Sequence, residues 1–358
     1  MSLVSSIIFR RSGDRSRCRA GRLGIDIGSK ALRVVQLDRQ GQRWKVRNRF
    51  TVPVTEPVTN LCADLKSGLL ERYLGRLQAL PFSRTKHCNC VLPPSVTEVR
   101  TVEVPPGSPA DVEMMSREAL QDSLESDLSD RTLRCWTHTV APRDMVQVSG
   151  ISVQTELAET VVDQFQACGW KCHQINSLPH ALTRAWEVSG GAADIPVGML
   201  SLRHSSALLT VCYRNQPEFM RSLRGCAGQS VVEAVSGGFG LAEADGVRLL
   251  ETYGIAGSET DRARRLVSDR IQQFMDPYLH QLNDQLQKTL MYLRHHMPKL
   301  FPKEIQITGE LATVPGLDDC VERICGVPAV RWSSSAVDAR PDDPQFAAAI
   351  AAASGGVQ

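Results

Sequence analysis

The chain has 358 residues, enough for about two domains with a large buried core. Hydrophobic residues make up 42% of it and charged residues 22%, as in ordinary globular proteins, so collagen-like, coiled-coil and wholly disordered chains are excluded. The 41 lysines and arginines nearly balance the 39 aspartates and glutamates, and a formal charge of +2 disfavours nucleic acid as the main partner.

Residues 1–22 are predicted to form a basic flexible tail. Six arginines lie between positions 10 and 22, with Asp14 as the one acid and with no hydrophobic period. Such a tail serves solubility or contacts anionic lipid headgroups. No apolar stretch approaches the roughly 20 residues of a membrane-spanning helix, and the arginines follow the first apolar residues, unlike in a secretory signal. We therefore expect a cytoplasmic protein.

Residues 23–37 alternate between apolar and other residues, which predicts two strands joined by a Gly28-Ser29 turn. A third strand over 43–52, an amphipathic helix over 61–80 and a buried strand over 87–92 follow. We assign residues 23–95, together with 177–190, to a first lobe. Within the segment 177–190, a helix is expected over 179–187.

Residues 96–176 are predicted to form an inserted α+β module. The pattern indicates a strand over 96–104, a helix over 111–128, strands near 134–140 and 145–153, a helix over 156–168 and a strand over 171–176. Eleven cysteines are scattered along the chain without any CxxC pair, which favours free thiols over a disulfide framework or a zinc site.

Residues 191–358 repeat the predicted order of strand, turn and strand that begins at Leu23, and we assign them to a second lobe. Strand, polar turn and strand occupy 197–212, a third strand 217–223, and a helix starts at Ser230. The recurrence of this arrangement after the one at Leu23 indicates an internal duplication. A long helix over 262–297, a buried strand over 304–308, a helix over 317–324 and a last apolar helix over 347–353 complete the lobe, and the chain is expected to fray over 354–356.

The segment Gly24 to Lys30, GIDIGSK, is the most informative stretch for function. A tight turn after a buried strand presents successive backbone N–H groups that bind phosphate oxygens, and Lys30 adds a positive charge. Asp26, at the end of the strand, is a candidate to hold Mg²⁺ through water. Taken alone, the segment fits an ordinary hairpin turn as well as a phosphate loop.

The sequence LGIDIGSKALRVVQL, residues 23–37, resembles the first phosphate loop of the actin-like ATPase superfamily. An ordered series of further stretches resembles the type IV pilus assembly protein PilM family within that superfamily. Among them are LPPSVTEVRTVEVP at 92–105, RSLRGCAGQSVVEAV at 221–235 and IQITGELATVPGLDDCV at 305–321. The resemblance implies an α/β actin-like ATPase fold, with two duplicated βββαβα-type lobes and an inserted module of the FtsA/PilM type.

The same resemblance implies a site for ATP and Mg²⁺. The residues it would assign to the phosphates, to the metal and to the adenosine are Asp26 (phosphate and metal), Gly28, Ser29 and Lys30 (phosphate), and Asp245, Arg248 and Gly309 (adenosine). The second phosphate loop departs from the family pattern, because Ser201-Leu202-Arg203 stands where the superfamily has Asp-x-Gly. Glu310 follows Gly309 in place of a second glycine. We therefore expect weak or absent nucleotide binding and a degenerate, non-enzymatic ATPase domain.

By resemblance, the function is that of a cytoplasmic scaffold of a type IV pilus or a related secretion machine, peripheral to the inner membrane. Its expected partners are the cytoplasmic N-terminal peptide of a PilN-like membrane protein and other components of the machine. The strand over 96–104 and the helix from Glu156 are the candidate walls of the peptide groove. The alternatives are an active ATP-binding and ATP-hydrolysing protein of the same fold, either kinase-like or filament-forming.

Overall fold

We analysed the protein as a computed structural model. It describes residues 22–40, 43–55, 58, 60–77, 86–123, 127–140, 144–255, 262–334, 340 and 343–355. The predicted basic tail lies outside the described residues except for Arg22. The chain divides into two compact units. Unit 1 comprises Met1–Gly190, Ser335–Val337 and Ala348–Gln358, and unit 2 comprises Gly191–Ser334 and Asp338–Ala347.

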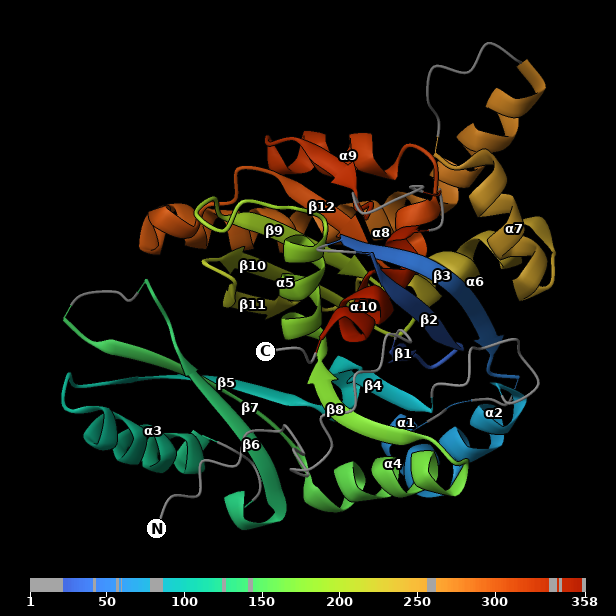
Figure 1. The fold of residues 1–358 in the computed structure, drawn as a ribbon. Helices are drawn as coiled ribbons and strands as arrows, with labels where there is room; N and C mark the ends of the chain where they lie inside the picture. The colour runs from blue at the N-terminus through green and yellow to red at the C-terminus, as the bar shows by residue number, and fades with distance from the viewer. Residues whose placement is uncertain are drawn as a thin grey trace. The chain divides into compact units, whose positions relative to one another are not determined.

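A five-stranded sheet forms the centre of unit 1, with the strand order β3-β2-β1-β4-β8 (Figure 1). The first three strands are antiparallel, whereas β4 and β8 continue from β1 in parallel. The strands are β1 (Leu23–Ile27), β2 (Ala31–Gln40), β3 (Arg43–Pro53), β4 (His87–Leu92) and β8 (Lys171–Ser177).

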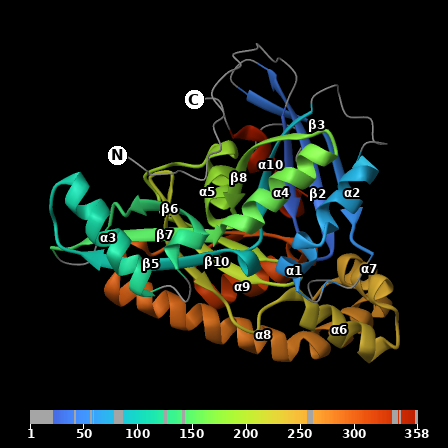
Figure 2. The same cartoon turned by 90° about the horizontal axis from the view of Figure 1, so that it is seen from below.

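The helices α1 (Leu61–Lys66), α2 (Leu69–Leu77) and α4 (Thr155–Ala167) lie together and share a hydrophobic core with this sheet (Figure 2). The prediction of one helix over 61–80 was wrong, because the chain breaks at Ser67-Gly68 between α1 and α2. Gly68 has a φ of 88°, a left-handed conformation that interrupts a right-handed helix.

The inserted module of unit 1 is a three-stranded antiparallel sheet with a helix beside it. The strand order is β5-β7-β6, so β5 (Glu98–Val104) and β6 (Arg131–Thr137) are edge strands on either side of β7 (Val146–Gln154). Helix α3 (Pro109–Ser123) lies alongside this sheet (Figures 1 and 2). The short 3-10 helices η1 (Pro94–Val96) and η2 (Leu128–Asp130) precede β5 and β6.

The range 96–176 assigned to the module also includes α4 and β8, which belong to the five-stranded sheet of unit 1 and its core and not to the sheet of the module. Strand β8 pairs with β4 of the first sheet, and α4 shares the core of that sheet. The alternation of apolar residues predicts a strand over 171–176, but it does not reveal the sheet that the strand joins.

The last helix, α10 (Asp343–Ser354), begins among residues of unit 2 and ends among residues of unit 1. It approaches β1 so closely that a Cβ atom at Gly24 would lie 1.9 Å from the carbonyl oxygen of Ala349. The side-chain amide of Asn89 donates to the carbonyl oxygens of Ala352, at 2.8 Å, and Gly355, at 3.0 Å. The expected fraying is therefore wrong for Ser354 and Gly355, and Gly356 lies outside the described residues. Helix α5 (Leu178–Val188) precedes unit 2.

Unit 2 repeats the sheet of unit 1. Its strand order is β11-β10-β9-β12-β13, again with three antiparallel strands followed by two parallel ones. The strands are β9 (Val197–Leu202), β10 (Ala207–Tyr213), β11 (Gln216–Ser222), β12 (Ile305–Thr308) and β13 (Ala329–Arg331). The common topology confirms the duplicated lobes that the sequence predicts.

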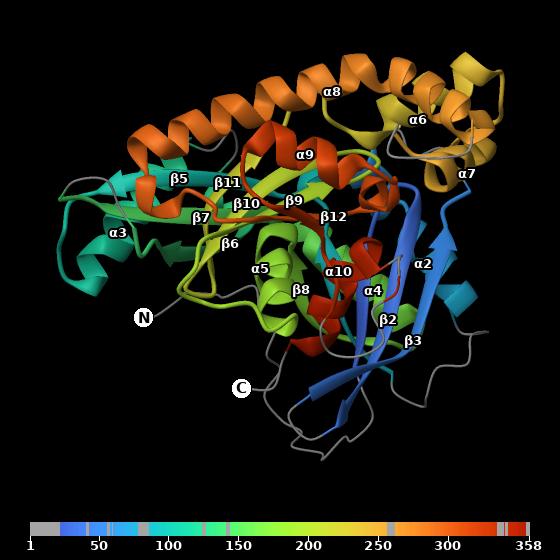
Figure 3. The same ribbon diagram turned by 90° about the horizontal axis from the view of Figure 1, so that it is seen from above.

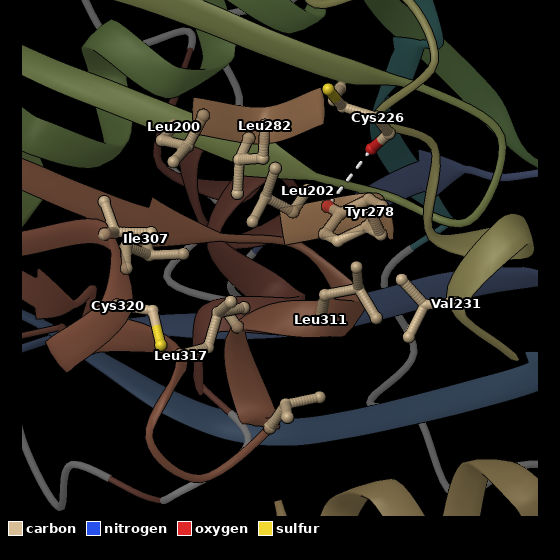
Figure 4. Packing of buried hydrophobic residues seen from close by; sticks show 14 of the residues in the cluster. Leu200, Leu202, Cys226, Val231, Tyr278, Leu282, Ile307, Leu311, Leu317 and Cys320 are labelled. Carbon is tan, nitrogen blue, oxygen red and sulfur yellow. Dashed lines mark hydrogen bonds between the residues drawn. The ribbon is translucent and has the colours of Figure 1, made fainter. Parts of the chain in front are cut away.

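Four helices pack around a large hydrophobic core in unit 2. They are α6 (Gly228–Phe239), α7 (Glu243–Tyr253), α8 (Arg262–His296) and α9 (Leu317–Cys325), and α6 and α7 lie beside α8 (Figure 3). The 3-10 helices η3 (Pro298–Leu300) and η4 (Glu310–Thr313) flank β12. Inside the core, the hydroxyl of Tyr278 donates to the carbonyl oxygen of Cys226 at 3.2 Å (Figure 4).

Candidate functional site

The predicted first phosphate loop is the hairpin between β1 and β2, in unit 1. Asp26 is 2% exposed and lies opposite Arg33 in the strand register. The turn is closed by the backbone N–H of Gly28, which donates to the carbonyl oxygen of Ala31 at 3.1 Å. The N–H of Gly28 is thus used within the hairpin, and the burial of Asp26 limits its access to water. Its role as a magnesium ligand stays a prediction.

The other two residues of the hairpin, Ser29 and Lys30, differ in exposure. Lys30 is exposed, and its carbonyl oxygen accepts a hydrogen bond from the N–H of Val54 at 2.8 Å. The hydroxyl of Ser29 is enclosed and has no hydrogen-bond partner within the part of the chain that the structure describes. Hydroxyl and ammonium groups are both suited to an anion, so Ser29 and Lys30 are the residues of this hairpin that fit a phosphate.

The corresponding hairpin of unit 2, between β9 and β10, is held by contacts within its own unit. Arg203, 5% exposed, donates its N–H to the carbonyl oxygen of Ser206 at 2.8 Å. The carbonyl oxygens of Arg203 and His204 accept from the N–H groups of Gly228 and Gln229, each at 2.8 Å. Gly228 and Gln229 begin α6, so two of the first N–H groups of this helix are satisfied by the hairpin.

A carboxylate lies against the same hairpin. Oε2 of Glu310 accepts the backbone N–H of His204 at 3.2 Å. The residue before it, Gly309, has a φ of 92°, and a Cβ atom there would lie 2.4 Å from the carbonyl oxygen of Leu202. Only glycine allows η4 to start this close to the end of β9. Gly309 therefore brings Glu310 to the turn where the superfamily pattern expects a phosphate loop.

Asp245 and Arg248, the other two predicted residues of unit 2, lie on the exposed side of α7. Nη1 of Arg248 is 3.4 Å from Oδ1 of Asp245, and both side chains are largely exposed. The contact of α7 with η4 is instead made by Glu251, which accepts a hydrogen bond from the hydroxyl of Thr313 at 3.4 Å. Glu251 was missed because its spacing on the helix resembles that of any exposed acid.

The inserted module carries a hollow of about 680 Å³ between α3 and the edge strand β6. Val112, Leu133 and Trp136 supply apolar surface to it, and Glu113 and Arg117 of α3 supply charge. Local residue patterns do not predict this hollow, because its walls come from segments whose pairing is set only by the tertiary fold.

A smaller hollow of about 20 Å³ lies where the module meets the first sheet, and His180 of α5 lines it. Nδ1 of His180 is 2.9 Å from the hydroxyl of Ser177, and its ring meets that of Trp136 edge to face. Burial, with a smaller contribution from the charge of Arg134, lowers the pKa of His180 to about 3. This imidazole is therefore neutral at physiological pH.

Over the described ranges, no cluster of three or more His, Cys, Asp or Glu side chains has an arrangement that would hold a metal ion. Over the same ranges, no helix combines the length and the apolar character needed to cross a membrane.

No protein-family model and no curated protein matches this chain. Solved structures do match. The chain is similar to a structure described as the PilM-PilN type IV pilus biogenesis complex, with a TM-score of 0.75 and 19% identity over 94% of this chain and 98% of that one. It is also similar to MreB 5 of Spiroplasma citri bound to AMPPNP, with a TM-score of 0.56 and 11% identity over 94% of this chain and 95% of that one.

A third similar structure is the ethanolamine utilization protein EutJ from Carboxydothermus hydrogenoformans. Its TM-score is 0.55, with 11% identity over 97% of this chain and 94% of that one. At these identities the likeness is one of fold. The chain has the α/β actin-like ATPase fold, and the particular form of that fold is PilM-like.

Proposed function

We propose that this chain is a cytoplasmic actin-like scaffold of a type IV pilus or related secretion machine, peripheral to the inner membrane. Its partner is the cytoplasmic N-terminal segment of a PilN-like membrane protein. The observation that carries the proposal is the similarity of fold, along nearly the whole chain, to PilM in a PilM-PilN complex. The inserted module supports it, because both edge strands of its sheet lack a further strand among the described residues.

The hollow between α3 and β6 is the place we propose for the partner segment. An edge strand leaves backbone N–H and C=O groups to pair with an added strand, and neighbouring apolar pockets select its side chains. The volume of about 680 Å³ is of the size that an extended segment of a few residues needs. The walls expected from the sequence, the strand over 96–104 and the helix from Glu156, are the alternative.

Two substitutions that introduce the same side chain on opposite edges of the sheet distinguish these places. Cys135 is exposed on β6 and lines the hollow, whereas Glu103 is exposed on β5, the opposite edge. A fluorescently labelled N-terminal peptide of the PilN-type protein from the same genome is titrated with each variant. We expect Cys135→Arg to raise Kd at least about tenfold by crowding the edge, and Glu103→Arg to change it less than about twofold. Loss of binding only in Glu103→Arg would move the site to β5.

We further propose that nucleotide binding is weak or lost. A phosphate loop binds its ligand through free backbone N–H groups, but in the second hairpin those of Arg203 and His204 are already bonded. Glu310 adds a negative charge at that turn, where it would repel a phosphate. For a weakly bound ATP, we propose the same contacts that the sequence resemblance implies. The residues are Asp26, Gly28, Ser29, Lys30, Asp245, Arg248 and Gly309.

Titration calorimetry with ATP and Mg²⁺ tests this second proposal. We expect a Kd weaker than about 1 mM for the purified protein. A micromolar Kd would contradict the proposal and would favour the alternative of an active ATP-binding protein, which phosphate release and nucleotide-dependent pelleting would then resolve into a hydrolase or a filament.

A further inference from the structure

Three thiols of unit 1 meet across two adjacent strands. Cys88 and Cys90 are two residues apart on β4, so they lie on the same face of the sheet. Cys172 of β8 is the register partner of Cys88, and its Sγ is 3.9 Å from the Sγ of Cys90. Neighbouring strands are about 4.8 Å apart, a separation that a disulfide can span.

The three thiols differ in their access to solvent. Cys88 and Cys90 are fully buried in the core of unit 1. Cys172 is half-buried and lines a hollow of about 660 Å³, together with Glu159 and Asp163 of α4. Of the three residues only Cys172 lines this hollow, so a small reagent there reaches Cys172 before the two buried thiols.

The surroundings of Cys172 favour its thiolate. Hydrogen bonding with the thiols of Cys88 and Cys90 lowers the pKa of Cys172 well below the ordinary value, although burial opposes this shift. The pKa values of Cys88 and Cys90 are raised, for Cys88 mainly by burial and for Cys90 mainly by its bond to Cys172. Of the three thiols, that of Cys172 is thus the one that ionises first.

The backbone at Cys172 is irregular. The register of β4 and β8 shifts between Cys88 and Asn89, so that β8 carries an additional residue, His173, at this point. Because β8 is the last strand of the sheet, no further strand fixes its outer side within the described chain. The strand therefore has room to adjust when a bond forms between the two sulfurs.

We propose that Cys172 is a site of reversible thiol oxidation by hydrogen peroxide, resolved by a thiol of β4. The Cys172 thiolate attacks one oxygen of the peroxide, so that an S–O bond forms while the O–O bond breaks and the leaving hydroxide takes a proton to become water. The thiol of Cys88 or Cys90 then attacks the resulting sulfenic sulfur and gives up its proton as it does so. The S–S bond forms, the S–O bond breaks, and the departing hydroxide takes up the released proton. In total, two thiols are oxidised and one peroxide is reduced to two waters.

The test uses the full chain without its other exposed or half-buried thiols and without Cys18, which lies outside the described residues. The background variant carries Cys18→Ser, Cys62→Ser, Cys135→Ser and Cys168→Ser. It is treated with a small excess of hydrogen peroxide, free thiols are counted with Ellman's reagent, and non-reducing peptide mass spectrometry locates any disulfide. We expect the loss of two thiols per chain, a disulfide from Cys172 to Cys88 or Cys90, and full recovery with dithiothreitol.

Two further variants in this background assign the roles. Cys172→Ala should leave the thiol count unchanged by peroxide, and Cys88→Ala combined with Cys90→Ala should leave a sulfenic acid at Cys172 that dimedone traps. Circular dichroism confirms that each variant is folded. If the double variant is not folded, the loss of thiols in Cys172→Ala is compared with that in the background variant alone. An unreactive Cys172, or an equal loss of thiols in Cys172→Ala, would overturn the proposal.

Discussion

Tyr278 is a polar residue in the apolar core of unit 2. It is 5% exposed, and burial raises the pKa of its hydroxyl above the ordinary value. Its hydrogen bond to the carbonyl oxygen of Cys226 ties α8 to the segment before α6. Removing the hydroxyl leaves that carbonyl without this donor, and an unsatisfied buried acceptor costs free energy.

We expect Tyr278→Phe to lower the free energy of unfolding by about 1–2 kcal/mol, measured by urea denaturation. The matched control is Tyr292→Phe, because Tyr292 is 45% exposed and stacks on His296. The control should stay within about 0.5 kcal/mol of the parent protein. Equal effects of the two substitutions would contradict the role given to the hydroxyl.

His180 makes stability depend on pH. Its pKa is about 3 in the folded chain, below the ordinary value of 6.5, so the unfolded chain takes up the proton first as pH falls. The stability due to the neutral imidazole is present above pH 6.5 and is lost between pH 6.5 and 3, by at most about 1.4 kcal/mol per pH unit.

Urea denaturation at several values of pH checks this expectation. His180→Gln should show a shallower fall in the free energy of unfolding between pH 6.5 and 4 than the parent protein. The exposed His295 provides the control, since His295→Gln should leave the slope unchanged. The same slope in all three proteins would show that His180 does not carry the pH dependence.

The contact of Glu310 with the second hairpin could not be predicted from the sequence. From the sequence it is a charged residue following Gly309, where the family pattern has a second glycine. Its bond to His204, 106 positions away in the chain, depends on the pairing of β9 with β12 and on the left-handed conformation of Gly309. Neither is visible in local residue patterns.

The last helix is an element whose end is held by side chains of unit 1. Nδ2 of Asn89 and Nη1 of Arg22 both donate to the carbonyl oxygen of Gly355, just after α10, and Asn89 also bonds to Ala352. The last carbonyl groups of a helix have no partners within the helix, so these donors satisfy them. Asn89 is fully buried, which makes its amide difficult to replace by water.

We expect Asn89→Ala to lower the free energy of unfolding by about 1–3 kcal/mol, because it removes one of the two donors to each of the carbonyl oxygens of Ala352 and Gly355. Asn283→Ala, at an exposed position of α8, is the control and should cost less than about 0.5 kcal/mol. Hydrogen exchange should also rise in α10 of the Asn89 variant. Unchanged exchange there would contradict the anchoring role of Asn89.

Helix α8 continues through Pro277, an exposed residue in its interior. Proline lacks the N–H that would bond to the carbonyl group of Gln273 and strains the preceding turn. We expect Pro277→Ala to raise the free energy of unfolding by about 1–2 kcal/mol. Pro298→Ala is the control, because proline at the first position of η3 costs nothing, and no gain is expected there. A gain in both variants, or in neither, would contradict this account.

Most elements follow from the sequence, because their hydrophobic periods are local. The strand predicted over 43–52 is β3, the helix over 262–297 is α8, and the helix over 317–324 is α9. The failures include Gly68, where one residue in a left-handed conformation divides a helix, and β8, whose sheet is set by long-range pairing. The short strand β13 was not predicted, since three residues carry no period.

On the scale of the whole molecule, the two units share one sheet topology with different additions. Unit 1 carries the module of β5, β6, β7 and α3, and unit 2 carries the long helix α8. In unit 2, the hairpin that corresponds to β1–β2 is bonded to its own helix and to Glu310. These features support the proposal that the chain is a binding scaffold whose partner binding does not depend on nucleotide.

The most direct measurement of that claim is the affinity for the PilN-type N-terminal peptide with and without ATP and Mg²⁺, by fluorescence anisotropy on the purified chain. We expect saturable one-to-one binding with the same Kd in both conditions, and no phosphate release during the titration. Absence of binding, or a complex that forms only with ATP present, would contradict the scaffold.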